Sequence, residues 1–274
     1  MHNLPEPDLH WTDHYVKYGF AVRRGLVDRA FCARALDEVR SMLGQTLPLN
    51  EWTRENTGQR HHIASENRVL RGVYDDPGLR AAIDEMFGGP GIANDQRQFQ
   101  LFISPYDPDA KAQISPRGHI DFVKCNIPVF GSGFMFQVSL VKSEPFSGNI
   151  TIYPGTHTHV QRLVMNDRSW RFPANEADIP DVEPYEFVAE PGDVLFFHHL
   201  VCHSGNNCHS AGRSPRVVLH CQALRDEWLH EVDPDQPGLS PWERSLATNG
   251  RYVCDRDEKH MRDQDKQAAR AAAR

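Results

Sequence analysis

Two segments near the start of the chain have the hydrophobic spacing of amphipathic helices. Apolar residues recur every three or four positions across Asp28–Gly44, where the aspartate suits an N-cap and the glycine suits a helix end. The segment Pro77–Phe87 has a proline in its first turn and is followed by Gly88-Gly89-Pro90, which stops a helix. The pattern therefore predicts a helical scaffold within residues 1–95.

The pattern changes to short β-rich runs after residue 95. These runs are rich in β-branched and aromatic residues and are separated by turn residues. No regular helices alternate with them, which disfavours a doubly wound parallel sheet and favours a sandwich or jelly roll. We therefore predict a mostly β fold, a double-sheeted barrel flanked by the N-terminal helices. The predicted strands are Gln98–Ile103, His119–Val123, Phe134–Val141, Asn149–Tyr153, Tyr185–Val188, Asp193–Phe197 and Arg216–Ala223.

The length of the chain fits one β-barrel domain, because barrels and sandwiches of 274 residues fold around a single core. We expect the scaffold to be followed by a jelly-roll core at residues 96–224 and a C-terminal extension at residues 225–274. The polar, proline-containing stretch Asn166–Pro184 is predicted to be a long loop over one end of the barrel.

Composition excludes several classes of protein. The longest apolar runs are far too short to cross a membrane, and no secretory signal is visible at the N-terminus, so we expect the protein to stay where it is made. The six cysteines are scattered without a CxxC pair, which is typical of reduced thiols. A net charge of -7, with basic residues interleaved with acidic ones, disfavours nucleic acid as a partner. We expect a cytoplasmic protein without disulfides, and nothing in the pattern specifies its oligomeric state.

The chain contains 15 histidines, and one of them lies in a promising pattern. His119 and Asp121 are two residues apart in a predicted strand, so their side chains point to the same face. His203 follows the apolar strand Asp193–Phe197 and is our candidate for a third ligand. Two histidines and one carboxylate form the facial triad of non-haem iron(II) oxygenases, which leaves three metal positions open.

Arg216 opens the last predicted strand, Arg216–Ala223. A guanidinium in that position makes a bidentate bond to a buried carboxylate, which a lysine does poorly. The residue is therefore a candidate anchor for a dicarboxylic co-substrate.

The order of these motifs resembles the phytanoyl-CoA dioxygenase family of Fe(II)/2-oxoglutarate-dependent oxygenases. The resemblance covers residues 96–224 and is carried by His119-Ile120-Asp121, the segment Ser147–His157, the turn Pro191-Gly192-Asp193-Val194, His203 and Arg216. It implies a double-stranded β-helix (a cupin-like jelly roll) with Fe(II) held by the two histidines and Asp121. It also implies 2-oxoglutarate on the metal with Arg216 at its far carboxylate, and use of O2 to hydroxylate or otherwise oxidise a small molecule, releasing succinate and CO2. Iron halogenases related to this family replace the carboxylate with a small residue, so Asp121 favours hydroxylation or another oxidation.

The sequence departs from the family pattern near the arginine. The family has a serine two residues after the distal histidine, where this chain has Gly205, and its arginine lies closer to that histidine. Arg213 therefore remains a rival for Arg216.

Gln100, in the strand before the HxD motif, resembles a polar contributor to the family's co-substrate pocket, and Ser104 lies where a longer amide or amine is usual. Gln137 is a polar residue in an apolar strand, which favours either a backbone hydrogen bond or a place facing the pocket, where it is a candidate for co-substrate binding beside Arg216 and Gln100.

Other histidines offer alternatives. His157 and His159 form an HxH pair, but no glutamate follows at cupin spacing, so we interpret His157 as structural or substrate-side. His198 and His199 are neighbours, and alternation predicts that one of them faces solvent. His220 is interpreted as a hydrogen-bonded core residue.

Two further hypotheses concern catalysis and the charge of the ligand. A metal-free or other cupin-type protein that binds a small molecule without turnover is the alternative to an enzyme. An anionic small-molecule substrate is suggested by arginines in the segments Asn50–Val73 and Asn166–Pro184, which we expect to be substrate-side loops. These are Arg54, Arg60, Arg68, Arg71, Arg168 and Arg171.

Overall fold

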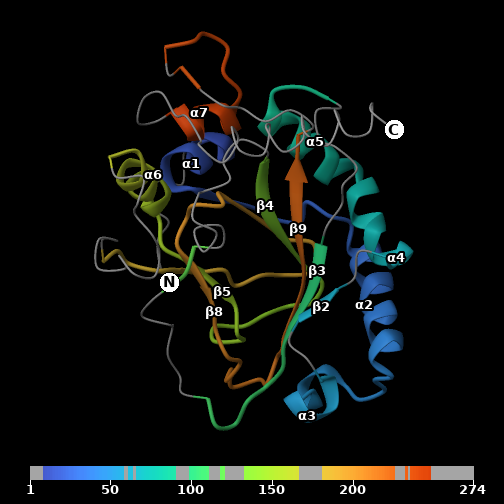
Figure 1. Cartoon of the computed structure of the whole chain (residues 1–274). Helices are drawn as coiled ribbons and strands as arrows, with labels where there is room; N and C mark the ends of the chain where they lie inside the picture. Colours follow the sequence, from blue (N-terminus) through green and yellow to red (C-terminus); the bar gives the residue numbers. More distant parts are fainter. Residues whose placement is uncertain are drawn as a thin grey trace, which may run out of the picture.

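Two antiparallel sheets form the centre of the protein in the computed structural model (Figure 1). The structure describes residues 9–58, 61–63, 66–90, 99–110, 118–120, 133–166, 181–225, 232–233 and 235–247. The larger sheet has six strands in the order β1-β7-β4-β9-β3-β2, and the smaller has three in the order β6-β5-β8. The strands are β1 Phe20–Arg23, β2 His61–Ile63, β3 Phe99–Ser104, β4 Gly133–Ser139, β5 Ile150–Ile152, β6 Tyr185–Glu186, β7 Val194–Phe197, β8 His203–Gly205 and β9 Arg216–Leu224.

The two helices predicted from the hydrophobic pattern are confirmed with their caps. Helix α2 (Arg29–Leu43) begins after Asp28, whose carboxylate accepts from Ala30 N, and ends at Gly44 in a left-handed conformation. Helix α5 (Pro77–Phe87) has an N-cap aspartate and a left-handed C-cap glycine. The other helical segments are α1 Trp11–Tyr18, η1 Leu49–Glu51, α3 Arg54–Thr57, α4 Arg68–Arg71, η2 Gly72–Asp75, α6 Thr156–Asn166 and α7 Pro241–Ala247.

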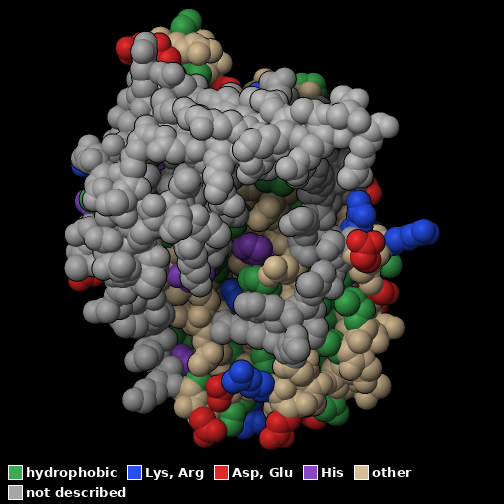
Figure 2. Space-filling model, in the orientation of Figure 1, with side chains coloured by type: hydrophobic (Ala, Val, Ile, Leu, Met, Phe, Trp, Pro, Cys, Tyr) green, Lys and Arg blue, Asp and Glu red, His purple; other side chains and the backbone are tan. Residues whose placement is uncertain are grey.

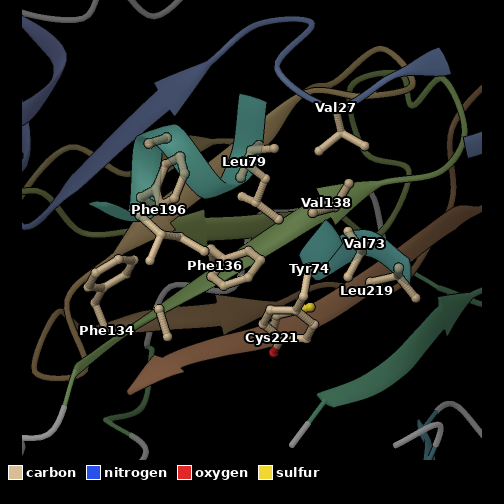
Figure 3. Packing of buried hydrophobic residues seen from close by; sticks show 14 of the residues in the cluster. Val27, Val73, Tyr74, Leu79, Phe134, Phe136, Val138, Phe196, Leu219 and Cys221 are labelled. Carbon is tan, nitrogen blue, oxygen red and sulfur yellow. The ribbon is translucent and has the colours of Figure 1, made fainter. Parts of the chain in front are cut away.

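One face of the six-stranded sheet packs against helices. Alternate residues of its strands join a hydrophobic cluster with apolar residues of α1, α2, α5 and α7 (Figure 3). Phe136 of β4 lies at the centre of this cluster with Phe196 of β7 and Leu219 of β9. We call this the outer face of the sheet.

The opposite, inner face packs against the smaller sheet. Phe197 of β7 and Met135 of β4 form a second cluster with Ile150 and Ile152 of β5. Because successive residues of a strand point to opposite faces, residues that alternate with the outer-face cluster point into the space between the sheets.

The N-terminal region contributes more than the predicted helices. β1 pairs with β7, and β2 pairs with β3, so two of the six strands come from residues before residue 64. Both are short, which leaves too few residues to establish an alternating pattern. The predicted strand at His119–Val123 is described only at its start, and most of the predicted loop at Asn166–Pro184 lies outside the described residues.

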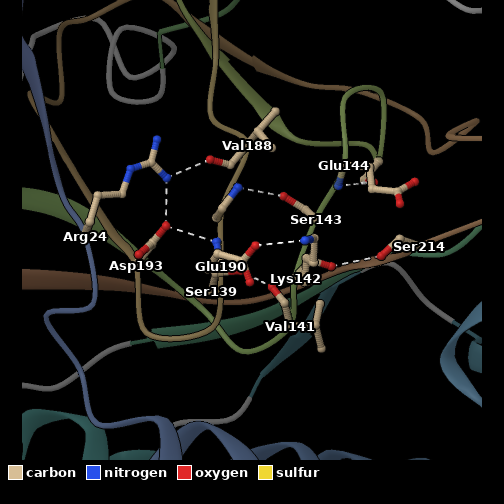
Figure 4. A network of polar contacts seen from close by, with 12 residues as sticks. Arg24, Ser139, Val141, Lys142, Ser143, Glu144, Val188, Glu190, Asp193 and Ser214 are labelled. Atoms are coloured by element: carbon tan, nitrogen blue, oxygen red, sulfur yellow. Dashed lines mark hydrogen bonds and ion pairs between the residues drawn. The ribbon is translucent and has the colours of Figure 1, made fainter. Parts of the chain in front are cut away.

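The predicted Pro-Gly-Asp turn links β7 to β1 (Figure 4). Asp193 is 3% exposed and accepts hydrogen bonds from Arg24 Nη1 at 2.7 Å, Gly25 N at 2.8 Å and Glu190 N at 2.9 Å. Gly192 has φ +89 and passes so close to the Val27 carbonyl that a side chain would collide with it. The motif therefore has a structural role at the edge of the sheet.

Within the described residues, no helix is long and apolar enough to span a membrane. The four cysteines in this part of the chain, Cys32, Cys202, Cys208 and Cys221, are buried free thiols.

Candidate functional site

His119 and His203 lie directly opposite each other in an antiparallel bridge between the segment before Asp121 and β8. Their backbones exchange both hydrogen bonds, His119 N to His203 O at 2.6 Å and His203 N to His119 O at 2.9 Å. Directly opposed residues in an antiparallel pair point to the same face. On its other side His203 pairs with Ile152 of the inner-face cluster, so both imidazoles face the space between the sheets.

The two rings have the separation that a shared metal ion requires. Their centroids are 4.4 Å apart with an interplanar angle of 50°. Two imidazoles bound at right angles to one ion, each with a metal–nitrogen distance of ~2.1 Å, have centroids about 4.5 Å apart. His203 Nδ1 lies 3.0 Å from Val201 O, so this nitrogen donates its proton and the lone pair of the ring is on Nε2, the nitrogen that a metal would bind. The described histidines therefore fit a metal site.

Asp121, the predicted carboxylate ligand, lies outside the described residues. Gly118, immediately before the pair, shows how closely the strands approach. A Cβ at this position would lie 2.7 Å from Cys202 Sγ and 2.8 Å from His203 O. Only glycine fits there without displacing the backbone that carries His203.

Arg216 lies deep in the space between the sheets, whereas Arg213, the alternative anchor, lies outside it. Arg216 is 4% exposed, pairs in register with Ser104 of β3, and donates from Nη2 to the Ser104 hydroxyl at 3.3 Å. Arg213 is exposed in a turn, has φ +52, and stacks its guanidinium over Tyr106. Burial therefore favours Arg216 for a carboxylate inside the protein.

Gln137 and Gln100 lie on the same row of the inner face. Both are cross-strand partners of His220, Gln137 through β4 and Gln100 through β3. Gln137 is 2% exposed and its Nε2 lies 3.0 Å from His220 Nδ1, whereas Gln100 is exposed. His220 is half-buried and stacks on Phe102 with ring centroids 4.9 Å apart.

The predicted hydrogen bond of His220 is confirmed, but the ring is half-buried and lies on the inner face, which it shares with Arg216. The sequence indicates this shared face, because His220 and Arg216 are four residues apart in one strand and such residues point the same way. Phe197 links it to the candidate metal ligand, with ring centroids 5.2 Å from His203 and 5.7 Å from His220.

Burial along the inner face defines a floor and a mouth. On β9, Arg216 and Val218 are buried, whereas His220, Gln222 and Leu224 are half-buried. On β3 the exposure rises in the same direction, from buried Ser104 through Phe102 to exposed Gln100. The face shown in Figure 2 is hollowed near its centre, and histidine and basic side chains lie within the hollow. The arginine end is thus the floor, and the His220 end leads to solvent.

The prediction that either His198 or His199 faces solvent is wrong. Both are buried, because they follow β7 in a turn rather than continuing a strand in which neighbours alternate. His157 is also fully buried, and its Nε2 donates to Val16 O at 3.1 Å, which supports the structural interpretation. In the described part of the chain, no group of three possible ligands is arranged around a metal position.

Solved structures with the same fold include three that are distant in sequence. The first is the non-heme alpha ketoglutarate dependent epimerase SnoN from nogalamycin biosynthesis, with 18% identity, a TM-score of 0.54, and coverage of 77% of this chain and 80% of that chain. The second is EctD from S. alaskensis with 2-oxoglutarate and 5-hydroxyectoine, with 15% identity, a TM-score of 0.55, and coverage of 78% and 74%. The third is EvdO2 from Micromonospora carbonacea var. aurantiaca complexed with 2-oxoglutarate, with 14% identity, a TM-score of 0.54, and coverage of 86% and 97%. At these identities the likeness concerns the fold.

The sequence itself matches the family model described as Phytanoyl-CoA dioxygenase (PhyH) over residues 15–218, about three quarters of the chain. The match includes both paired histidines and Arg216, and it extends the resemblance found in the motifs back to α1. The chain therefore belongs to the phytanoyl-CoA dioxygenase family.

Proposed function

We propose that the protein is an Fe(II)/2-oxoglutarate-dependent dioxygenase that hydroxylates or otherwise oxidises a C–H bond of a small-molecule metabolite. The observation that carries this proposal is the opposed pair His119 and His203, with ring centroids 4.4 Å apart on the inner face. The family and the ligands of two structural neighbours, EctD and EvdO2, support the choice of 2-oxoglutarate. Within this proposal the two sheets belong to a double-stranded β-helix.

The proposed metal ligands are His119, Asp121 and His203. The hydrogen bond from His203 Nδ1 to Val201 O fixes the tautomer in which Nε2 would bind the ion. Asp121, two residues after His119, would share its face if the strand continues as the sequence predicts. When bound, iron with 2-oxoglutarate and O2 supplies the oxidising chemistry, with succinate and CO2 as by-products.

Arg216 is the proposed anchor for the far carboxylate of 2-oxoglutarate. Its guanidinium is buried at the floor, and its hydrogen bond to Ser104 orients it. A buried arginine offers a carboxylate two parallel hydrogen bonds, and burial strengthens each by excluding water.

The proposed substrate is a small molecule that enters from the His220 end. The hypothesis of an anionic substrate receives little support from the described arginines. Arg68 and Arg71 belong to α4, which packs with α2 in the helical layer beyond the outer face, and Arg54 is exposed on α3. Arg60, Arg168 and Arg171 lie outside the described residues.

The proposal is tested by anaerobic binding of Fe(II), followed by titration with 2-oxoglutarate, monitored by the charge-transfer absorbance of the complex. We expect His119→Ala and His203→Ala to lose iron, and Arg216→Lys to retain iron but bind 2-oxoglutarate about 10- to 100-fold more weakly, because lysine lacks the planar fork. His10→Ala and Arg213→Ala are matched controls that alter exposed residues away from the site. Iron binding that survives in both histidine variants would refute the assignment.

Turnover is tested separately by measuring succinate release from 2-oxoglutarate in air. Product analysis with candidate metabolites then distinguishes hydroxylation from other outcomes, such as the epimerisation named for the neighbour SnoN. A protein that binds iron and 2-oxoglutarate but never forms succinate would favour the non-catalytic binding alternative.

A further inference from the structure

We propose that Gln137, positioned by His220, accepts a hydrogen bond from an O–H or N–H group of the substrate. The inference rests on the proposed function and deepens it, because it specifies what the substrate must carry: a neutral or cationic hydrogen-bond donor, such as a hydroxyl. Both residues lie in the inner-face row that leads from the buried interior towards solvent.

Only one of the two polar atoms of the Gln137 amide has a hydrogen-bond partner in the described part of the chain. Its Nε2 lies 3.0 Å from His220 Nδ1 and donates to it. Its Oε1 is buried and has no hydrogen-bond partner among the residues that the structure describes. A buried polar atom without a partner is costly, so such an atom at the inner face of a ligand-binding fold marks a place where a ligand supplies the missing partner.

The position of His220 fixes which amide atom is presented. His220 is held between two aromatic rings, stacked on Phe102 and in contact with Phe197. Because His220 Nδ1 accepts from Gln137 Nε2, the imidazole fixes the amide so that Oε1 is the atom left for another donor. His220 is thus a positioning residue, and Gln137 is the contact residue.

The co-substrate does not satisfy this acceptor. At neutral pH 2-oxoglutarate carries two carboxylates and a ketone, all of which accept hydrogen bonds and none of which donates one. A carboxylate oxygen placed beside Gln137 Oε1 would be repelled. The co-substrate therefore cannot supply the missing donor, which in this proposal the bound substrate supplies.

The location agrees with a substrate contact. His220 is four residues along β9 from Arg216, which corresponds to about 13 Å along the strand. Arg216 marks the buried floor, where the far carboxylate of the co-substrate would lie, and exposure rises from there towards His220 and Gln100. Phe197 contacts both His203 and His220, so the row passes beside the candidate metal ligand. A molecule entering from solvent would reach Gln137 beside the metal.

The experiment compares the wild type with Gln137→Met, His220→Phe and His220→Asn. Methionine keeps the length of glutamine without its polar atoms, and phenylalanine keeps the stacked ring without Nδ1. Asparagine places an acceptor oxygen near the position of Nδ1 and serves as the conservative rescue. Each protein is loaded anaerobically with Fe(II) and titrated with 2-oxoglutarate. Melting curves then give the apparent affinity for cyclohexanol, benzyl alcohol and 2-phenylethanol and for their methyl ethers, which cannot donate a hydrogen bond.

We expect at least one alcohol to bind the wild type about five-fold more tightly than its ether, the effect of one neutral hydrogen bond. Gln137→Met and His220→Phe should bring this ratio close to one, and His220→Asn should restore it, while all variants keep the wild-type affinity for 2-oxoglutarate. A wild type that never prefers an alcohol, or a Gln137→Met protein with weakened 2-oxoglutarate binding, would overturn the proposal. If Gln137→Met does not fold, the contrast between the two His220 variants decides. Failure of the wild type to bind iron and 2-oxoglutarate would instead overturn the proposed function.

Discussion

At the scale of single residues, the candidate metal site depends on how closely two backbones approach. The imidazoles of His119 and His203 point the same way because their backbones are directly hydrogen-bonded to each other. Gly118 permits this approach, since a Cβ there would lie within 3 Å of Cys202 Sγ and of the His203 backbone. The glycine is therefore expected to control the metal geometry although it carries no side chain.

We predict that Gly118→Ala weakens iron binding about 10-fold or more, because displacement of His203 disturbs the supporting contacts of a ligand. Overpacking should also lower the free energy of unfolding by about 1 to 3 kcal/mol. Iron titration and urea denaturation measure the two effects. The matched control is Gly72→Ala, where the added Cβ would make only an ordinary contact of 3.4 Å with Phe31. Equal iron affinity in the two variants would contradict the prediction.

At the scale of elements, two carboxylates in the turn before β7 form ion pairs that are expected to contribute unequally to stability (Figure 4). Asp193 is buried and also accepts from two backbone N–H groups besides Arg24. The pair between Lys142 and Glu190 is comparably short at 3.0 Å, but both side chains are largely exposed. Solvent screening makes an exposed pair weak, whereas loss of a buried acceptor leaves donors unsatisfied.

We predict that Asp193→Ala lowers the free energy of unfolding by about 2 to 3 kcal/mol, because β1 loses its tie to the turn. Lys142→Ala should change it by less than about 0.5 kcal/mol. Urea denaturation of both variants gives the comparison. If the two substitutions cost the same, the buried hydrogen bonds do not have the structural role assigned to them.

Elements with strong local signals could be predicted from the sequence. Helix α2 has Asp28 and Gly44 at its ends, and β9 has a long apolar run, so both were predicted close to their observed bounds. The short strand β1 was missed because its place in the sheet depends on pairing with β7, far along the chain. The sequence does not predict helix α6 (Thr156–Asn166), because the helix directly follows a glycine turn whose residues belong to the family motif.

The candidate site was predictable as a set of residues but not as a geometry. The structure brings His119 and His203 together as expected, while metal binding itself and the role of Asp121 stay predictions. The choice between Arg213 and Arg216 required burial, which sequence spacing does not give. The bond between Gln137 and His220 depends on the register of β4 with β9, a long-range property.

At the scale of the whole molecule, three buried histidines join the N-terminal helix to the sheets. The rings of His157 and His198 have centroids 5.2 Å apart, and those of His198 and His199 are stacked at 4.4 Å. His157 donates to the Val16 carbonyl in α1, and its ring lies against Gly19. Burial lowers the pKa of His157 and of His199 to about 4, and burial together with the neighbouring histidines lowers the pKa of His198 well below its usual value.

We predict that the protein loses stability as the pH falls from about 6.5 to about 4. In this window the unfolded chain binds protons at histidines that stay neutral in the folded protein, so the free energy of unfolding decreases as the pH drops and is fully retained above about 6.5. The loss is on the order of 3 kcal/mol for each of His157 and His199, and the contributions are not additive because the rings contact one another. Urea denaturation at a series of pH values measures it. His157→Gln keeps a donor for Val16 without titrating, so an unchanged pH dependence in that variant would contradict the assignment.

Ligand binding is expected to stabilise the whole fold, because the candidate ligands come from separate segments that separate on unfolding. His119 precedes the first described residues of β4, His203 belongs to β8, and Arg216 begins β9. A ligand at 100 times its dissociation constant stabilises the folded state by about 2.7 kcal/mol. For a chain of this size we predict a rise in Tm of about 5 to 10 °C with saturating Fe(II) and 2-oxoglutarate under anaerobic conditions. His203→Ala should abolish the shift and His10→Ala should retain it. A shift that persists in His203→Ala would mean that the stabilising ligand binds elsewhere.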